Sequence, residues 1–154
     1  MNILVTGGTG YIGSHTCVAL LERGHSVIIA DNLSNSKAEV VKKIKQITGK
    51  GIVFYQVDVT EEAATDAIFS NHPIDGVVHF AGLKAVGESV VKPLEYYSNN
   101  LLSTMTLATL CKRYGVKRFV FSSSATVYGD NKVPFVESMS LLPTTNPYGE
   151  PPVS

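Results

Sequence analysis

A glycine-rich turn near the start of the chain has the residue types and spacing of a phosphate-binding loop. Gly8, Gly10 and Gly13 form the pattern G-x-G-x-x-G, and Gly7 extends it to G-x-x-G-x-x-G. The turn follows an apolar run and precedes a helical pattern, which is the context that this motif requires. Glycines there allow a tight turn and bring backbone N–H groups close to a pyrophosphate at the helix N-terminus. The motif alone is weak evidence, because structural turns also collect glycine.

A carboxylate at the end of the second apolar run strengthens this interpretation. Asp31 comes near the interval of about 20 residues after the glycines at which a dinucleotide fold places an acidic residue. A carboxylate there accepts hydrogen bonds from a ribose hydroxyl and repels the additional phosphate of NADP. Lys37 is the only cation nearby in the sequence. We therefore predict a dinucleotide site that prefers NAD to NADP.

The ends of three later apolar runs carry further candidates, because ligands of such sheets bind beyond the carboxyl ends of the strands. Asp58 and Val59 end the third run, where the carboxylate either meets an adenine amino group or caps the helix expected near Glu61. Residues 80–82 end the fourth run, where small residues let the backbone approach a ligand. Residues 122–124 end the fifth run with three serine hydroxyls, which either contact substrate or cap a turn.

Four other side chains have competing interpretations. His79 is more consistent with a hydrogen-bonded core histidine than with a catalytic one, since it stands in an apolar run. Lys84 either balances phosphate charge or is a solvated lysine. Cys17 and Cys111 are too few for a disulfide scaffold and have no metal-ligand spacing, so we interpret both as small core residues and predict no metal site.

The elements that must position these residues alternate between strand and helix. The expected strands are residues 2–6, 26–30, 52–57, 75–80 and 117–122. The expected helices are residues 14–23, 36–48, 61–70 and about 94–113. The strands are near-continuous apolar runs, which is typical of a parallel sheet covered by helices on both faces. We therefore predict an α/β fold with a doubly wound, Rossmann-like sheet of strand order 3-2-1-4-5.

The last expected helix carries apolar residues at three- and four-residue steps, which predict the face that it buries. These residues are Leu94, Tyr97, Leu101, Met105, Ala108 and Cys111. Leu102 and Leu110 lie off this stripe, and we expect them to be available for pairing with a second copy of the chain.

Composition narrows the class of protein. The chain has 154 residues, a net charge of +0, and 44% hydrophobic against 17% charged residues, which predicts a folded domain rather than a disordered one. A neutral chain lacks the electrostatic basis for nucleic-acid or acidic-membrane binding. No apolar run approaches a membrane span and the start has no signal peptide, so a soluble, cytoplasmic protein is expected. We expect an NAD-binding domain over residues 1–122 and an active-site loop over the proline-rich residues 123–154.

Five segments together resemble the UDP-glucose 4-epimerases, a family of extended short-chain dehydrogenases/reductases. They are residues 6–15 (TGGTGYIGSH), 31–36 (DNLSNS), 79–89 (HFAGLKAVGES), 122–129 (SSSATVYG) and 146–149 (NPYG). The stretch from Gly82 to Ser89 is far more specific than the glycine turn, and the resemblance extends over the chain up to Gly149.

The resemblance implies tightly held NAD and a set of residues around it. The implied cofactor residues are Gly7, Gly10, Tyr11, Ile12 and Gly13 at the pyrophosphate, Asp31, Asn32, Leu33, Ser34, Asn35 and Ser36 at the adenosine ribose, Asp58 and Val59 at the adenine, and Phe80, Ala81, Gly82, Leu83, Lys84 and Asn99 along the remainder. Ser124 and Tyr148 are implied as the catalytic pair, which contacts both the cofactor and a UDP-hexose substrate. The implied reaction is NAD-dependent epimerisation at C4, which interconverts UDP-glucose and UDP-galactose in galactose metabolism. The full-length parent is implied to be a homodimer.

The sequence departs from the family pattern after Tyr148. The family places a lysine four residues after the tyrosine, whereas this chain has Pro152 there, preceded by Pro151. The chain then ends at Ser154, so we expect it to be an inactive or incomplete piece of the enzyme. Two alternatives stay open. One is a non-catalytic NAD-binding module. The other is a nucleotide-sugar enzyme such as a 4,6-dehydratase, which is disfavoured because Ala125-Thr126 provides no carboxylate after the serines.

Overall fold

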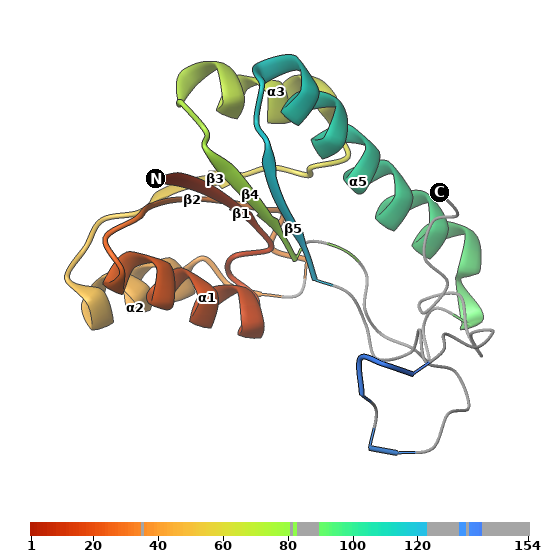
Figure 1. The fold of residues 1–154 in the computed structure, drawn as a ribbon, viewed down its shortest axis with the longest axis horizontal. Helices are drawn as coiled ribbons and strands as arrows, with labels where there is room; N and C mark the ends of the chain where they lie inside the picture. The colour runs from red at the N-terminus through yellow and green to blue at the C-terminus, as the bar shows by residue number, and fades with distance from the viewer. Residues whose placement is uncertain (35, 81, 83–89, 123–132, 135, 140–154) are drawn as a thin grey trace. The chain divides into compact units, whose positions relative to one another are not determined.

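The computed structural model describes residues 1–34, 36–80, 82, 90–122, 133–134 and 136–139. Five strands alternate with four labelled helices along this part of the chain (Figure 1). The strands are β1 (Asn2–Thr6), β2 (Ser26–Asp31), β3 (Val53–Gln56), β4 (Gly76–His79) and β5 (Arg118–Phe121). The helices are α1 (Tyr11–Glu22), α2 (Glu39–Thr48), α3 (Glu62–Asn71) and α5 (Pro93–Tyr114).

The strands form one parallel sheet in the order β3-β2-β1-β4-β5, which confirms the predicted doubly wound topology. The first crossovers run outward from β1 through β2 to β3, and the chain then returns to the other side of β1 for β4 and β5. The direction of winding therefore reverses between β1 and β4, which is where open α/β sheets bind ligands. In the register of the sheet, Thr6 lies opposite both Ala30 and His79.

Alternate residues of the central strands pack into two hydrophobic layers, one on each face of the sheet. Ile3, Val5 and Ile29 pack with residues of α1 and α2, including Cys17 and Leu21. The opposite face has a second layer formed by strand residues with residues of α3 and α5: Leu4, Ile28, Ala30, Val77, Ile68, Phe69, Leu107, Leu110 and Cys111. Figure 1 shows α1 and α2 on one side of the sheet and α3 on the other. Both cysteines are buried in these layers, as predicted.

The chain divides into two compact units. One contains Met1–Ala81 and Ser103–Ser122, and the other contains Gly82–Leu102 and Ser123–Ser154. The first unit holds the whole sheet, α1, α2, α3 and the later part of α5.

Two helices, α1 and α2, begin three residues away from the positions that their sequence patterns indicated. α1 begins at Tyr11 rather than at residue 14, so that Gly13 lies inside its first turn. Glycine has a low helix propensity, which is why the pattern excluded it, but close packing at this turn overrides propensity. α2 begins at Glu39 rather than at residue 36, because the preceding residues form a loop after β2.

The buried face of α5 was predicted wrongly. Leu94, Tyr97, Leu101 and Met105 are exposed, with 80% of Leu94 accessible. Ala108 of the predicted stripe is exposed as well, and Cys111 is the one stripe residue that is buried as predicted. The other buried residues of the helix are Tyr96, Ser103, Thr106, Leu107 and Leu110. Leu110, which was expected off the core, is fully buried, whereas Leu102 is exposed as expected. A face that includes a serine and a threonine does not stand out in a pattern that counts only apolar residues.

The strand at one edge of the sheet also differs from the expected pattern. β5 has exposed side chains throughout, including Phe119, Val120 and Phe121, although its run is as apolar as those of the central strands. Because an edge strand has a neighbour on one side only, an apolar run does not by itself establish burial.

Candidate functional site

The glycine turn joins β1 to α1 at the carboxyl edge of the sheet. Gly7 adopts the left-handed conformation, with φ of 70°, and its N–H donates to the carbonyl of Ala30 on β2 at 2.9 Å. The Gly10 N–H donates to the carbonyl of Gly7 at 3.1 Å, which closes the turn. Gly10 is then the N-cap of α1, and it makes no side-chain cap hydrogen bond. The first turn of α1 thus presents backbone N–H groups at the positive end of the helix dipole.

Close packing makes glycine necessary at one position of this turn. A Cβ placed on Gly13 would lie 2.2 Å from the carbonyl oxygen of Gly7 and 3.0 Å from the Cα of Gly8. Both contacts are with backbone, so no side chain can rotate to relieve them. The same carbonyl would be 3.3 Å from a Cβ on Gly10, which is a tighter contact than usual but a tolerable one. Gly13 therefore holds the start of α1 directly against the loop.

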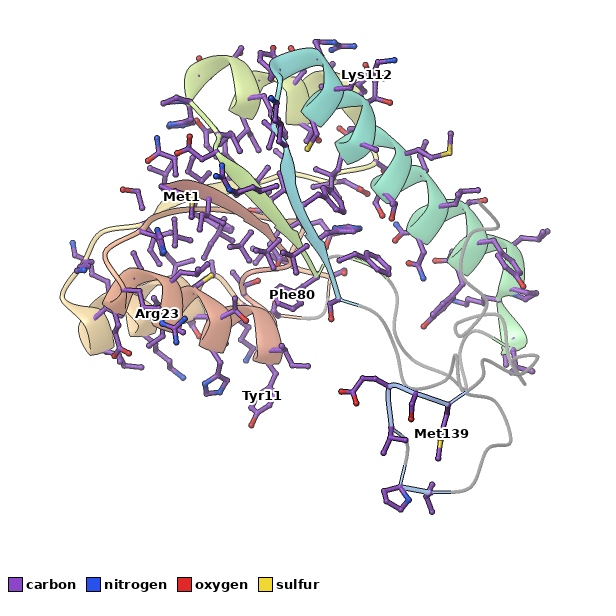
Figure 2. The ribbon with its side chains drawn as sticks, in the orientation of Figure 1. Met1, Tyr11, Arg23, Phe80, Lys112 and Met139 are labelled. Atoms are coloured by element: carbon purple, nitrogen blue, oxygen red, sulfur yellow. The ribbon has the colours of Figure 1, made fainter. Side chains whose placement is uncertain are left out.

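Two large side chains at the start of α1 face solvent. Tyr11 is 82% exposed, and Ile12 is exposed as well. Figure 2 shows Tyr11 projecting away from the sheet at the N-terminal end of α1, and its ring makes an edge contact with His15 at 4.9 Å between centroids. Both residues were predicted to border the pyrophosphate, and they lie where the helix N-terminus opens to solvent.

Asp31 is the acceptor at the centre of a hydrogen-bond cluster. Its Oδ2 accepts from the backbone N–H of Thr9 at 3.2 Å and from the Thr9 hydroxyl at 2.5 Å. Its Oδ1 accepts from the N–H of Leu33 at 2.8 Å. The Thr9 hydroxyl is also 2.5 Å from the hydroxyl of Ser36. The structure thus brings together Asp31 and Ser36, which were both predicted at the ribose.

The loop after β2 is shaped by two successive side chain to backbone turns. Asp31 binds the N–H of Leu33, and the Asn32 Oδ1 accepts from the N–H of Ser34 at 3.0 Å. Leu33 has φ of 61°, a left-handed conformation that is unusual for a leucine. These turns fix the backbone from the strand end toward Ser36. Asn35, also predicted here, lies outside the described residues.

Asp58 follows β3 and closes a local turn rather than capping the next helix. Its Oδ1 accepts from the N–H and the hydroxyl of Thr60, at 3.0 and 2.7 Å. The N-cap of α3 is Glu61, without a side-chain cap bond, so the cap interpretation of Asp58 is wrong. Val59 is buried in the core beneath this turn.

His79 is a core residue, as the sequence favoured. It is buried at the end of β4, and its Nδ1 is 2.6 Å from the Thr6 hydroxyl at the end of β1. Its Nε2 is 3.5 Å from the Ser103 hydroxyl of α5. The histidine therefore ties together two strand ends and a helix. Phe80 follows it at the carboxyl end of β4, as labelled in Figure 2.

Several predicted site residues lie in the second unit or outside the described residues. Asn99 is half-buried on α5. Gly82 has φ of 151°, and a Cβ there would lie 3.0 Å from the Asn100 side-chain oxygen. Ala81, Leu83, Lys84, Ser124 and Tyr148 lie outside the described residues, as do Pro151 and Pro152.

The two thiols are unsuited to chemistry at this site. Burial raises the pKa of the Cys17 thiol to about 12, and it raises the pKa of Cys111 as well. Because the thiolate is the reactive form, both cysteines are unreactive at neutral pH.

Among the described residues, no helix is sufficiently long and apolar to cross a membrane.

The sequence did not indicate Thr9, which occupies a variable position of the glycine motif. Its side chain is 2% exposed and it is the residue that connects the glycine turn to Asp31. The hydroxyl of Thr9 among the glycines could have indicated a hydrogen-bonding role. The motif is defined by its glycines alone, so the residues between them were not considered as candidates.

Comparison with known proteins gives consistent results. Residues 3–151 match the model of the NAD dependent epimerase/dehydratase family. The UDP-glucose 4-epimerase of Bacillus subtilis is 54% identical over 150 residues, which cover 97% of this chain and 44% of the relative. A UDP-glucose 4-epimerase sequence of Klebsiella pneumoniae is 58% identical over 139 residues, covering 90% of this chain and 100% of the relative.

A solved structure has the same fold over nearly the whole chain. The UDP-glucose 4-epimerase of Bifidobacterium longum, in complex with NAD+ and UDP, superposes with a TM-score of 0.94 at 50% identity. The superposition covers 97% of this chain and 45% of that structure. The chain thus spans less than half the length of the Bacillus relative and of this structure.

Proposed function

This chain belongs to the NAD dependent epimerase/dehydratase family, and from that premise we propose that its first unit binds NAD at the carboxyl edge of the sheet. The observation that carries the proposal is the pairing of a glycine-bounded helix N-terminus with a carboxylate at the end of the adjacent strand. The start of α1 lies against the loop without room for a Cβ at Gly13. Asp31 lies at the end of β2, next to β1 in the sheet.

The described residues fit the parts of NAD in order along this edge. Gly7, Gly10 and Gly13 bring the backbone close to the pyrophosphate, where Tyr11 and Ile12 border it. Asp31 and Ser36 accept hydrogen bonds from the adenosine ribose, and Asp58 lies on the adenine side because β3 follows β2 in the sheet order. Phe80 lies on the opposite side, at the end of β4, toward the nicotinamide.

The activity that we propose for the protein of which this chain is a part is epimerisation at C4 of a UDP-hexose. It interconverts UDP-glucose and UDP-galactose, which places it in galactose metabolism. NAD held at this edge would supply the hydride acceptor and donor for C4 of the sugar. Tyr148 takes the proton of the 4-hydroxyl, and Ser124 hydrogen-bonds the same oxygen and relays the proton.

A second candidate function is a non-catalytic NAD-binding module, and Pro152 favours it. A free tyrosine has a pKa of about 10 and is a weak base at pH 7 unless a nearby cation lowers that pKa. Proline at the position of the family lysine removes that cation and disfavours a continuing helix. The 154 residues alone are therefore proposed to bind NAD without turnover.

We further propose that the protein acts in the cytoplasm, because both cysteines are free thiols.

The exposed face of α5 supports a homodimer of the full-length protein. Leu94, Leu101 and Leu102 are exposed within one stretch of this helix. Single exposed apolar residues are normal on a protein surface, whereas a group of them is typical of an interaction surface. A second copy of the same helix would cover these leucines.

The two candidate functions are separated by one set of assays. NADH binding is followed by the fluorescence of the reduced nicotinamide itself. Conversion of UDP-galactose into UDP-glucose is measured for the chain, for the P151T/P152K variant, and for that variant joined to the C-terminal portion of a related epimerase. We expect NADH binding by all three proteins and turnover only by the joined protein. Turnover by the unaltered chain would refute the module, whereas absence of NADH binding would refute both functions.

A further inference from the structure

The hydroxyl of Thr9 links three segments of the predicted ribose site. It lies 2.5 Å from the Asp31 Oδ2, at the end of β2, and 2.5 Å from the Ser36 hydroxyl, in the loop that follows. Thr9 itself belongs to the glycine turn after β1 and is buried. One buried side chain therefore holds the acidic residue, the serine and the phosphate-binding turn in a fixed arrangement.

The chemistry of these groups fixes the direction of both hydrogen bonds. A threonine hydroxyl has one proton, and the Asp31 carboxylate can only accept. The Thr9 proton is therefore donated to Asp31. Toward Ser36 the Thr9 oxygen must then accept, so the proton of Ser36 points inward to Thr9. The outward side of Ser36 is left with lone pairs, and the site presents acceptors from both Ser36 and Asp31.

We propose that Thr9 is a specificity-determining positioning residue, which selects a cofactor with a free ribose diol by keeping both Ser36 and Asp31 as hydrogen-bond acceptors. This inference rests on the proposed NAD function. A diol offers two protons to the two acceptors. A 2′-phosphate offers none and adds negative charge next to a carboxylate. Asp31 supplies the repulsion, while Thr9 prevents Ser36 from turning its proton toward a phosphate.

Thr9 acts through its neighbours rather than on the ligand. Its hydroxyl has both of its hydrogen bonds inside the protein, and only 2% of the residue is accessible. In a Thr9→Val variant the Ser36 proton loses its acceptor and becomes free to bind a phosphate oxygen. The Asp31 Oδ2 retains the backbone N–H of residue 9 but loses its shorter bond.

The test is calorimetric titration of the chain and its Thr9→Val and Thr9→Ser variants with NAD and NADP. A hydrogen bond to a charged group corresponds to roughly tenfold or more in affinity. We expect Thr9→Val to weaken NAD binding about tenfold and to lower the ratio of the NADP to the NAD dissociation constant at least fivefold. Thr9→Ser, which keeps the hydroxyl, should restore both values.

Two further variants distinguish this role from a loss of folding. Thr65→Val removes a buried hydroxyl that donates to the Glu61 carbonyl at 2.8 Å on α3, and it should leave the ratio unchanged. Ser36→Ala removes one acceptor outside the core, and it should weaken NAD while leaving NADP unaltered. Equal weakening of both cofactors by Thr9→Val, or an unchanged NAD affinity in Ser36→Ala, would overturn the inference. If the unaltered chain bound NAD and the variants gave either of these contrary results, the proposed function would stand and the role of Thr9 would be refuted. If the unaltered chain did not bind NAD, the proposed function and the role of Thr9 would both be refuted.

Discussion

Replacing Gly13 by alanine tests how the glycine turn holds the first turn of α1. The added Cβ would lie 2.2 Å from the Gly7 carbonyl oxygen, whereas real Cβ atoms essentially never approach within 3.0 Å of another heavy atom. The start of the helix must therefore move away from the loop by at least 0.8 Å, the difference between these distances. Because both contacting atoms belong to the backbone, the movement displaces the N–H groups proposed to bind the pyrophosphate.

Two opposing effects determine the size of the loss. Alanine is favoured over glycine in a helix by about 1 kcal/mol. Overpacking of a close contact costs about 1–3 kcal/mol, and more where backbone must move. We expect a net loss of about 2 kcal/mol in the free energy of unfolding. The displacement also exceeds the roughly 0.5 Å range of good N–H···O distances, so the NAD affinity should fall at least about tenfold.

The assay is urea unfolding together with NADH titration, on matched alanine variants. Gly51→Ala is the control, since a Cβ there meets nothing within 4 Å. Gly10→Ala, with its 3.3 Å contact, should give an intermediate result. A Gly13→Ala protein that matches Gly51→Ala in both stability and NADH affinity would refute the close-packing argument.

The remaining predictions concern the carboxylate, the buried thiol and the exposed helix face. Asp31→Ala should narrow the preference for NAD over NADP, measured by calorimetry; an unchanged preference would show that the carboxylate does not discriminate. Burial raises the pKa of Cys17 from its ordinary value of 9.0 to about 12 in the folded chain, so folding favours the neutral thiol. The stability that this contributes is complete below pH 9.0 and is lost as the pH rises toward 12. Between these pH values the free energy of unfolding should therefore fall less steeply with pH for Cys17→Ala than for the unaltered chain. Parallel curves of this free energy against pH would contradict the burial of the thiol. Leu102→Glu in the full-length protein should convert a dimer into a monomer at micromolar concentration, as seen by light scattering. A monomer before the substitution would rule out the dimer.

The sequence was sufficient to predict the sheet, its strand order and the placement of the central strands. β1 and β2 begin at the predicted residues, and their apolar runs are bounded by the glycine turn after β1 and by Gly24 and Asn32 on either side of β2. Parallel strands connected by right-handed crossovers then leave few alternative topologies. The prediction was weaker at helix starts. Gly13 has a low helix propensity, but close packing against the loop places it inside the first turn of α1.

The buried face of α5 could not be predicted from apolar periodicity. The helix contains apolar residues around most of its circumference, so the spacing of Leu94, Tyr97, Leu101 and Met105 selected one of several possible stripes. Burial follows the neighbours of a helix, and Leu107 and Leu110 are buried because they contact the layer that includes Ile68 and Phe69. The same reasoning explains β5, whose exposure depends on its place at the edge.

At the site, the sequence identified residues at strand ends but not the contacts that orient them. Asp31 was expected from its interval after the glycines, and it is the last residue of β2, the strand that pairs with β1. Thr9 was missed because its role depends on a distance across the loop, between residues far apart in sequence. Whether Asp58 capped a helix was equally open until the geometry showed its bonds to Thr60.

Calorimetric titration of the unaltered 154-residue chain with NAD and with NADP, under the same conditions, tests the central claim most directly. The arrangement of Gly13, Asp31 and Ser36 predicts one binding site for NAD per chain and at least tenfold weaker binding of NADP, as expected when a phosphate must approach a carboxylate. Equal affinity for the two cofactors, or no heat of binding with either, would contradict the account.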